Sequence, residues 1–213
     1  MTTSSPPVVG LVGLGAMGAG MAQSLRRAGH APHVFDLRRE VAQAFARDGG
    51  TACDTLAALG AASDIVISVV VNAQQTEAVL FGDGGTPGCA ASMKPGSLFV
   101  MCSTVDPNWS VALEARLATL GLLYLDAPIS GGAAKAASGQ MTMMTAGTPA
   151  AYDKAAGVLD AMAAKVYRLG DSAGAGSKVK VINQLLAGVH IAAAAEAMAL
   201  GLREGVDLSL IHI

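Results

Sequence analysis

Three glycines at the spacing G-x-G-x-x-G follow directly after the apolar run Val8–Val12 and could hold a phosphate group. In this pattern the first glycine permits a tight turn, the second lets the backbone approach a pyrophosphate, and the third lets the next helix pack against the strand. That helix also directs its N-terminus at the phosphate charge. The pattern predicts a dinucleotide site. Its phosphate loop would consist of Gly13, Leu14, Gly15, Ala16, Met17 and Gly18.

A carboxylate stands where such a site needs one. Asp36 ends the next apolar run, His33–Phe35, and lies about 20 residues beyond the glycines, where an acid accepts hydrogen bonds from ribose hydroxyls. Its charge would repel a 2′-phosphate, which favours NAD over NADP, although Arg38 or Arg39 could turn toward such a phosphate. The alternative is a flexible turn in a glycine-rich chain, but it does not explain why strand, turn, helix and acid occur in this order. We therefore expect NAD as the cofactor.

A second group of residues could take a proton from a substrate. Lys180, Asn183 and Gln184 stand at i, i+3 and i+4 in a predicted long helix, so their side chains share one face. Lys178 lies roughly opposite, and Ser177 is expected to cap the helix. A lysine on a helix is most often a solvated surface residue, and this alternative stays open on residue types alone.

The segment Asp126–Gly132, which reads DAPISGG, could hold a carboxylate. The Ser130 hydroxyl and the backbone N–H groups of Gly131 and Gly132 would face the same edge of the fold. An ordinary Pro-Gly turn explains the residue types equally well. The segment is therefore a candidate substrate loop.

Strand-like and helical segments alternate along the chain, which predicts an α/β fold with a Rossmann-like, doubly wound, mainly parallel sheet followed by one long helix. The strands are expected at Val8–Val12, His33–Asp36, Asp64–Val71, Ser97–Cys102, Leu122–Asp126, Met141–Ala146 and Lys165–Leu169, and the long helix from Ser177 to about Gly205. The carboxyl ends of parallel strands open on one edge, where ligands bind. Four loops should meet there: Gly13–Gly18, Val71–Ala73, Cys102–Val105 and Asp126–Gly132.

Composition excludes several other classes of function. The formal net charge is −2 with no large basic cluster, so nucleic acid is not an expected partner. The hydrophobic fraction of 52% comes largely from alanine, and we expect no run of membrane-spanning length and no membrane partner. Three cysteines and four histidines lack metal-ligand spacing, so no metal is expected. Met1–Pro6 contains no Lys or Arg and does not resemble an export signal, which favours a cytoplasmic protein.

Taken together, the motifs resemble those of the β-hydroxyacid dehydrogenases, the relatives of 3-hydroxyisobutyrate dehydrogenase and 6-phosphogluconate dehydrogenase. Val12–Gly18 resembles the cofactor fingerprint of that family, Asp126–Gly132 its substrate loop, and Gly174–Lys180 with Asn183 its catalytic motif. The resemblance implies that Lys180 is catalytic. It also implies that Thr104 of the Ser103-Thr104 pair lies beside the nicotinamide, with Val71 and Asn72 in the cofactor loop.

Departures from the family pattern narrow the expected substrate. Gln184 stands where a second asparagine is usual, and Val70–Ala73 replaces a common Leu-Pro. These features resemble the L-threonate dehydrogenase branch, which implies NAD-dependent oxidation of a small hydroxyacid, most simply L-threonate to its 2-oxo acid. The alternatives are a tartronate semialdehyde reductase, a 3-hydroxyisobutyrate dehydrogenase or a non-catalytic dinucleotide sensor.

The resemblance divides the chain into a cofactor domain at residues 1–170 and an interdomain helix at residues 171–207. Family members continue into an all-helical domain that this sequence lacks, and their full-length form is expected to be a homo-oligomer. Leu208–Ile213, the sequence LSLIHI, is also what CTG TCT CTT ATA CAC ATC encodes, the end of a transposon-based sequencing adapter. We expect these six residues to be an artefact. Without the helical domain, an apolar face of the long helix should be exposed, and the chain should have poor solubility or little activity. A longer read of the source DNA that continues through the same six residues would contradict this.

Overall fold

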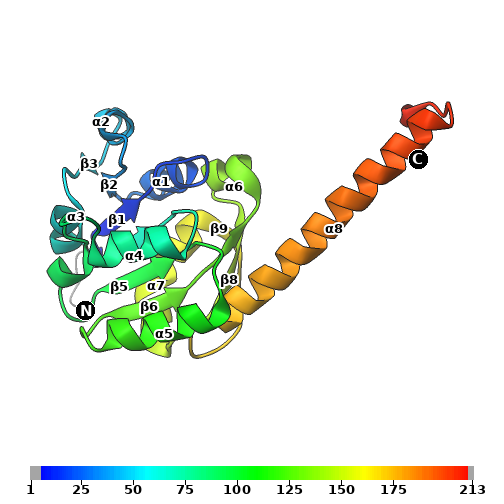
Figure 1. The fold of residues 1–213 in the computed structure, drawn as a ribbon. Helices are drawn as coiled ribbons and strands as arrows, with labels where there is room; N and C mark the ends of the chain where they lie inside the picture. Colours follow the sequence, from blue (N-terminus) through cyan, green and yellow to red (C-terminus); the bar gives the residue numbers. More distant parts are fainter. Residues whose placement is uncertain (1–5, 211–213) are drawn as a thin grey trace.

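Six parallel strands form the central sheet in the order β3-β2-β1-β4-β5-β6. The computed structural model describes residues 6–210 (Figure 1). The strands are β1 (Val9–Val12), β2 (His33–Phe35), β3 (Thr51–Ala52), β4 (Ile65–Ser68), β5 (Leu98–Met101) and β6 (Leu123–Asp126). This order confirms the Rossmann-like, doubly wound prediction. Within this sheet, the two-residue strand β3 has no counterpart among the expected strands, because it is too short to show a pattern.

Helices cover both faces of this sheet, and the strands supply alternate residues to the two layers. Ile65 and Ile67 pack on one side with helices α1 and α7, whereas Val66 packs on the other side with α3, α4 and α5. Phe99 lies in this second layer as well. The helices are α1 (Gly18–Arg27), α2 (Arg39–Arg47), α3 (Leu56–Ala62), α4 (Ala73–Phe81), α5 (Pro107–Ala118), α6 (Gly132–Ser138), α7 (Pro149–Met162) and α8 (Ala175–Arg203), with 3₁₀ turns at Ala90–Ser92 and Leu208–Leu210. Burial on both faces explains why the strands read as continuous apolar runs.

A second, three-stranded sheet extends the fold beyond β6. It contains β7 (Ile129–Ser130), β8 (Met141–Thr145) and β9 (Ala163–Arg168), with β7 antiparallel to β8 and β8 parallel to β9. The backbones of Asp126 and Ala146 exchange hydrogen bonds and connect the two sheets. The last two predicted strands therefore exist, but in a separate sheet. The expected loop Asp126–Gly132 also contains β7, because Ile129 and Ser130 pair with β8.

Helix α8 leaves the rest of the fold and extends away from it (Figure 1). Of its 29 residues, the buried ones are Gly176, Ser177, Lys180 and Gly201. Apolar side chains along it are exposed, including Ile182, Leu185, Leu186, Val189 and Ile191. The exposed apolar face expected from the sequence is thus confirmed in the described part of the chain.

The same helix corrects one expectation about membranes. Ala175–Arg203 is long and apolar enough to cross a membrane by length and composition alone, so the expectation that no run reaches spanning length is wrong. Alanine and glycine separate the larger apolar side chains along this helix, but they are not polar, so the helix as a whole is still apolar. The absence of a membrane partner stays a prediction. Residues 211–213, the end of the presumed adapter sequence, lie outside the described residues.

Candidate active site

The glycine loop lies at the carboxyl end of β1. Strands β2 and β3 follow on one side of β1 and strands β4 to β6 on the other, so the strand order reverses at this point of the sheet. Gly13 has φ +92° and donates its N–H to the Phe35 carbonyl at 2.9 Å. A Cβ on Gly18 would collide with the Gly13 carbonyl oxygen, so packing within the protein itself requires this glycine. A Cβ on Gly15 would meet nothing within 4 Å. Gly15 is therefore not needed by the fold, and the open space beside it fits a phosphate-bearing ligand.

Asp36 lies beside this loop with its carboxylate already held in place. Its Oδ2 accepts a hydrogen bond from the Leu14 backbone N–H at 2.7 Å, and its Oδ1 accepts from the Arg38 backbone N–H at 2.9 Å and from Arg38 Nε at 3.1 Å. Burial alone would raise the pKa of Asp36, but the hydrogen bonds from Arg38 and Leu14 bring it below the usual value. The carboxylate is therefore ionised at neutral pH, and its hydrogen bonds fix its orientation.

A cavity of about 660 Å³ opens between the glycine loop and Asp36. A volume of this size is within the range of small-molecule and cofactor sites. Four of the predicted cofactor residues line it, namely Gly13, Gly15, Asp36 and Val71. The cavity therefore joins two of the four loops that the parallel order was expected to bring together.

Other residues at the cavity were not found from the sequence. They include Leu37, Leu56 and Gln75, together with Asp83 and Thr86 from the glycine-rich loop after α4. That loop folds back through a pair of backbone hydrogen bonds between Asp83 and Thr86. No sequence signal marked these residues, because ordinary apolar and turn residues line a cavity only through the tertiary arrangement.

Asn72 and Thr104, also predicted for the cofactor, are not among the residues that line the cavity. Asn72 caps helix α4 by accepting a hydrogen bond from the Gln75 N–H at 2.9 Å. Thr104 is exposed after β5, and its neighbour Ser103 is buried and donates to the Val70 carbonyl at 2.7 Å. Asn72 and Ser103 thus have structural roles that hold the two loops in shape, and a cofactor role for Asn72 and Thr104 stays a prediction.

The start of helix α8 is bound to the end of β6 by a buried carboxylate. Asp126 Oδ2 accepts the backbone N–H groups of Gly174 and Ser177, each at 2.9 Å, and Oδ1 accepts the Ser177 hydroxyl at 2.7 Å. A Cβ on Gly176 would lie 2.5 Å from the Met144 carbonyl oxygen, so only glycine permits this close approach. Ser177 was predicted to cap the helix, and this is wrong. Gly174 is the N-cap residue, and Ser177 lies inside the first turn, where its hydroxyl binds Asp126 instead.

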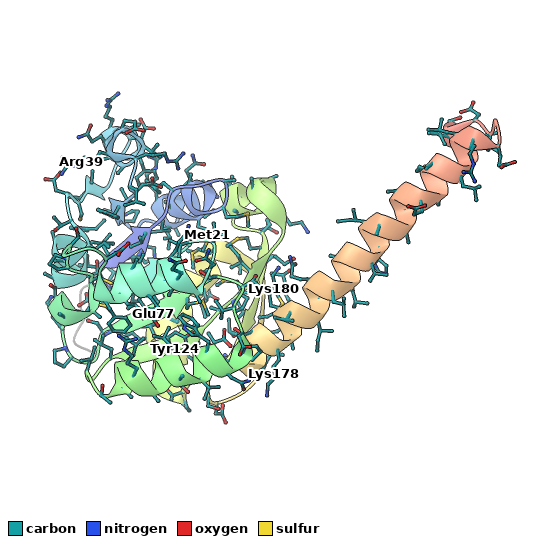
Figure 2. All side chains as sticks on the ribbon, viewed as in Figure 1. Met21, Arg39, Glu77, Tyr124, Lys178 and Lys180 are labelled. Carbon is teal, nitrogen blue, oxygen red and sulfur yellow. The ribbon has the colours of Figure 1, made fainter. Side chains whose placement is uncertain are left out.

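Lys180 lies one turn further along α8 and is buried, with 7% of its surface exposed. Burial lowers the pKa of its amine. Lys178 is exposed, and the two lysines lie on opposite sides of the helix (Figure 2). The choice of Lys180 over Lys178 as the lysine in a site is therefore supported by burial, and a lowered pKa makes this amine easier to deprotonate than an exposed lysine.

The candidate substrate residues are on three elements, β7, α6 and α8, which all contact β8. Ser130 lies in β7, which pairs with β8, and Gly131 and Gly132 form the start of α6 with φ of +139° and +75°. Helix α8 packs against the same strand β8. Asn183 and Gln184 are exposed on α8, one turn beyond Lys180. The assignment of these five residues to a substrate stays a prediction.

Within residues 6–210, no three His, Cys, Asp or Glu side chains gather into a group that could hold a metal ion. The sequence did not indicate one feature of Asp126, namely that its buried carboxylate binds the start of α8. The residue ends a predicted strand and begins the candidate substrate loop, but its partners Gly174 and Ser177 lie 48 and 51 residues further along the chain.

Known protein families match this chain over almost its whole length. Residues 8–170 match the family described as the NAD binding domain of 6-phosphogluconate dehydrogenase, and residues 174–212 match the one described as NAD-binding of NADP-dependent 3-hydroxyisobutyrate dehydrogenase. An L-threonate dehydrogenase of Cupriavidus necator is 64% identical over 199 residues, which are 93% of this chain and 66% of that protein. A second L-threonate dehydrogenase, of Pectobacterium atrosepticum, is 44% identical over the whole chain, which covers 69% of it.

A solved structure is similar over the same extent. The crystal structure of a 3-hydroxyisobutyrate dehydrogenase from Salmonella typhimurium has a TM-score of 0.88 and 46% identity, over 95% of this chain and 70% of that one. The chain thus spans about two thirds of the length of these relatives, and their remaining third has no counterpart in the sequence. The glycine loop, the buried lysine and the similarity over the whole chain lead to one conclusion: the chain belongs to the 3-hydroxyisobutyrate dehydrogenase-like family of NAD(P)-dependent dehydrogenases.

Proposed function

We propose that this protein oxidises a small hydroxyacid with NAD, and that L-threonate is its substrate. The observation that carries the proposal is the burial of Lys180 at the start of α8, because burial lowers the pKa of an amine and makes it a proton acceptor. The relatives named L-threonate dehydrogenase supply the choice of substrate.

The choice of NAD over NADP follows from Asp36. Its ionised carboxylate lines the cavity and would repel a 2′-phosphate. Arg38 lines the same cavity and is paired with this carboxylate at 3.1 Å, so a phosphate would have to compete with Asp36 for its guanidinium. NAD bound in this cavity would supply the nicotinamide carbon that accepts a hydride from the substrate.

Lys180 would act as the proton shuttle. With its pKa lowered by burial, the neutral amine takes the proton of the substrate hydroxyl while the carbon of that alcohol loses a hydride, which leaves a 2-oxo acid. Ser130, Gly131 and Gly132 would hold the substrate carboxylate through a hydroxyl and backbone N–H groups. Asn183 and Gln184, one turn beyond Lys180, would bind a substrate hydroxyl or orient the amine.

The wider organisation is also a proposal. The cofactor domain at residues 1–170 and the interdomain helix at residues 171–207 agree with the end of β9 at Arg168 and the start of α8 at Ala175. A homo-oligomer for the full-length form rests on the family resemblance, and a cytoplasmic location stays a prediction from the sequence.

The test compares Lys180→Met with Lys178→Met as the matched control. Titration calorimetry measures NAD binding, and the rate of NADH formation is followed with L-threonate and 3-hydroxyisobutyrate, and in reverse with tartronate semialdehyde. We expect Lys180→Met to lose turnover with NAD binding unchanged, and Lys178→Met to keep both. Retained turnover in Lys180→Met would contradict the shuttle. In the full-length protein, NAD binding without turnover on any of these substrates would instead favour the dinucleotide sensor.

A further inference from the structure

Asp126 is the residue through which the main sheet holds helix α8. Its two carboxylate oxygens accept three hydrogen bonds from the first residues of the helix and the residue before it, at 2.7–2.9 Å. The side chain is fully buried, with 0% of its surface exposed. A carboxylate at a helix N-terminus is favoured by the partial positive charge there and by N–H groups that have no partner within the helix.

We propose that Asp126 is the positioning residue for Lys180, and that it sets both the depth and the rotation of helix α8 so that the lysine is buried. Ser177 and Lys180 are three residues apart, so they lie on nearly the same face and about 4.5 Å apart along the helix axis. The hydroxyl of Ser177 is fixed to Asp126 at 2.7 Å. A rotation of the helix that broke this bond would turn Lys180 out of its buried position.

Beyond its first turns, which pack against β8 and α5, helix α8 offers little other support for Lys180. Besides Gly176, Ser177 and Lys180, the buried residue of this helix is Gly201, near its far end. Glu114 accepts the Ala173 N–H at 3.0 Å, but this bond holds the segment before the helix and not the helix itself. The position of Lys180 therefore depends on the first turns of α8, which are held by the hydrogen bonds to Asp126 and by packing against β8 and α5.

Asp126 does not act on the substrate directly. Its carboxylate has no contact with solvent and is occupied by groups of α8. Burial raises the pKa of Asp126, and the hydrogen bonds from Ser177 and Gly174 offset part of that rise. An effect of Asp126 on turnover would rest on the proposed function. Its effect on the placement of Lys180 does not, because that placement can be measured without any substrate.

The test measures the titration of the Lys180 amine in Asp126→Asn, by trace acetylation at a series of pH values and mass spectrometry of the modified lysine. The matched control is Asp64→Asn, which makes the same chemical change where a carboxylate accepts one backbone N–H, from Val8 at 2.9 Å, at the opposite end of the strands. We expect the titration midpoint of Lys180 to shift upward toward the ordinary lysine value in Asp126→Asn and to stay unchanged in Asp64→Asn. NAD affinity should remain within about threefold of the wild-type value in both, which corresponds to less than about 0.7 kcal/mol.

A second variant covers the case in which Asp126→Asn does not fold. Ser177→Ala removes only the 2.7 Å bond and keeps the carboxylate, so its midpoint should shift in the same direction by a smaller amount. An unchanged midpoint in the folded variants, or an equal shift in Asp64→Asn, would overturn the proposal. If Lys180→Met keeps turnover while these shifts occur, the proposed shuttle fails and the positioning role of Asp126 stands.

Discussion

Two glycines of the same loop should respond in opposite ways to the same substitution. Gly18→Ala places a methyl group against the Gly13 carbonyl oxygen, whereas Gly15→Ala places it in open space. Gly15 is also absent from the glycines with positive φ, so alanine can adopt its backbone conformation. We therefore expect Gly18→Ala to damage the fold and Gly15→Ala to damage only the binding of the dinucleotide.

The magnitudes follow from these contacts. Alanine at an unstrained glycine position stabilises a protein by about 0.4–1 kcal/mol, because it restricts the unfolded chain. For a chain of this size, Gly15→Ala should raise the melting temperature by about 1–4 °C. Overpacking costs about 1–3 kcal/mol, so Gly18→Ala should lower it by about 2–12 °C. A methyl group at Gly15 would hold the pyrophosphate away from the backbone, and the loss of one charge-assisted hydrogen bond, about 1.5–3 kcal/mol, weakens NAD binding by about 10- to 150-fold.

The assay combines thermal unfolding of the free proteins with titration calorimetry of NAD. Wild type and Gly15→Ala are compared under identical conditions, with Gly18→Ala as the variant in which the fold itself is affected. If Gly15→Ala bound NAD as tightly as wild type, the space beside Gly15 would not be the phosphate site. If it melted as low as Gly18→Ala, the reasoning from packing would be refuted.

Three further outcomes test the remaining features. Asp36→Ala should weaken NAD binding about tenfold or more, since it removes a charged hydrogen-bond acceptor, and should improve NADP binding; calorimetry with both nucleotides would contradict this if NADP affinity did not rise. Burial lowers the pKa of Lys180 in the folded state. Below that lowered pKa, the folded protein carries the full cost of a buried ammonium group. Between the lowered pKa and the unfolded value of about 10.4, the stability of the wild type rises with pH. Lys180→Met should therefore be at least as stable as wild type at pH 7, by an excess that shrinks toward high pH, and unfolding curves that differ by a constant amount would argue against a buried amine. Replacing the exposed Ile182 and Leu185 by Gln should reduce self-association in light scattering by severalfold without changing NAD affinity, whereas unchanged association would show that this face is not responsible.

Much of the fold could be read from the sequence because the pattern and the structure obey the same constraint. Strands buried on both faces must be almost wholly apolar, and the stretch Ile65–Val71, which reads IVISVVV between Asp64 and Asn72, is such a run. The cofactor loop was equally readable, because Gly13 and Gly18 are required by backbone geometry that only glycine permits. Local rules of this kind leave a direct mark on residue types.

What the sequence did not reveal depends on contacts between distant segments. Asp126 and Ser177 are 51 residues apart, and only the fold brings the carboxylate to the helix start. For the same reason Ser177 was assigned as a cap, a role that its residue type fits locally but that Gly174 takes in the structure. The placement of the last two strands in a separate sheet likewise depends on the pairing of β7 with β8. A strand of two residues such as β7 is too short to be predicted from the sequence.

The glycine loop depends on the pairing of β1 with β4, so the dinucleotide site forms only after both strands are in the sheet. Gly13 packs against the backbone of Val69, and the Val69 N–H donates to the Val12 carbonyl at 2.9 Å, so the loop acquires its shape only when a strand more than 50 residues away is in place. A folding intermediate that held only the first two strands would therefore lack the site. Because a ligand that binds only the native state adds RT ln(1 + [L]/Kd) to its stability, NAD would select against such partly folded chains and raise the cooperativity of the whole domain.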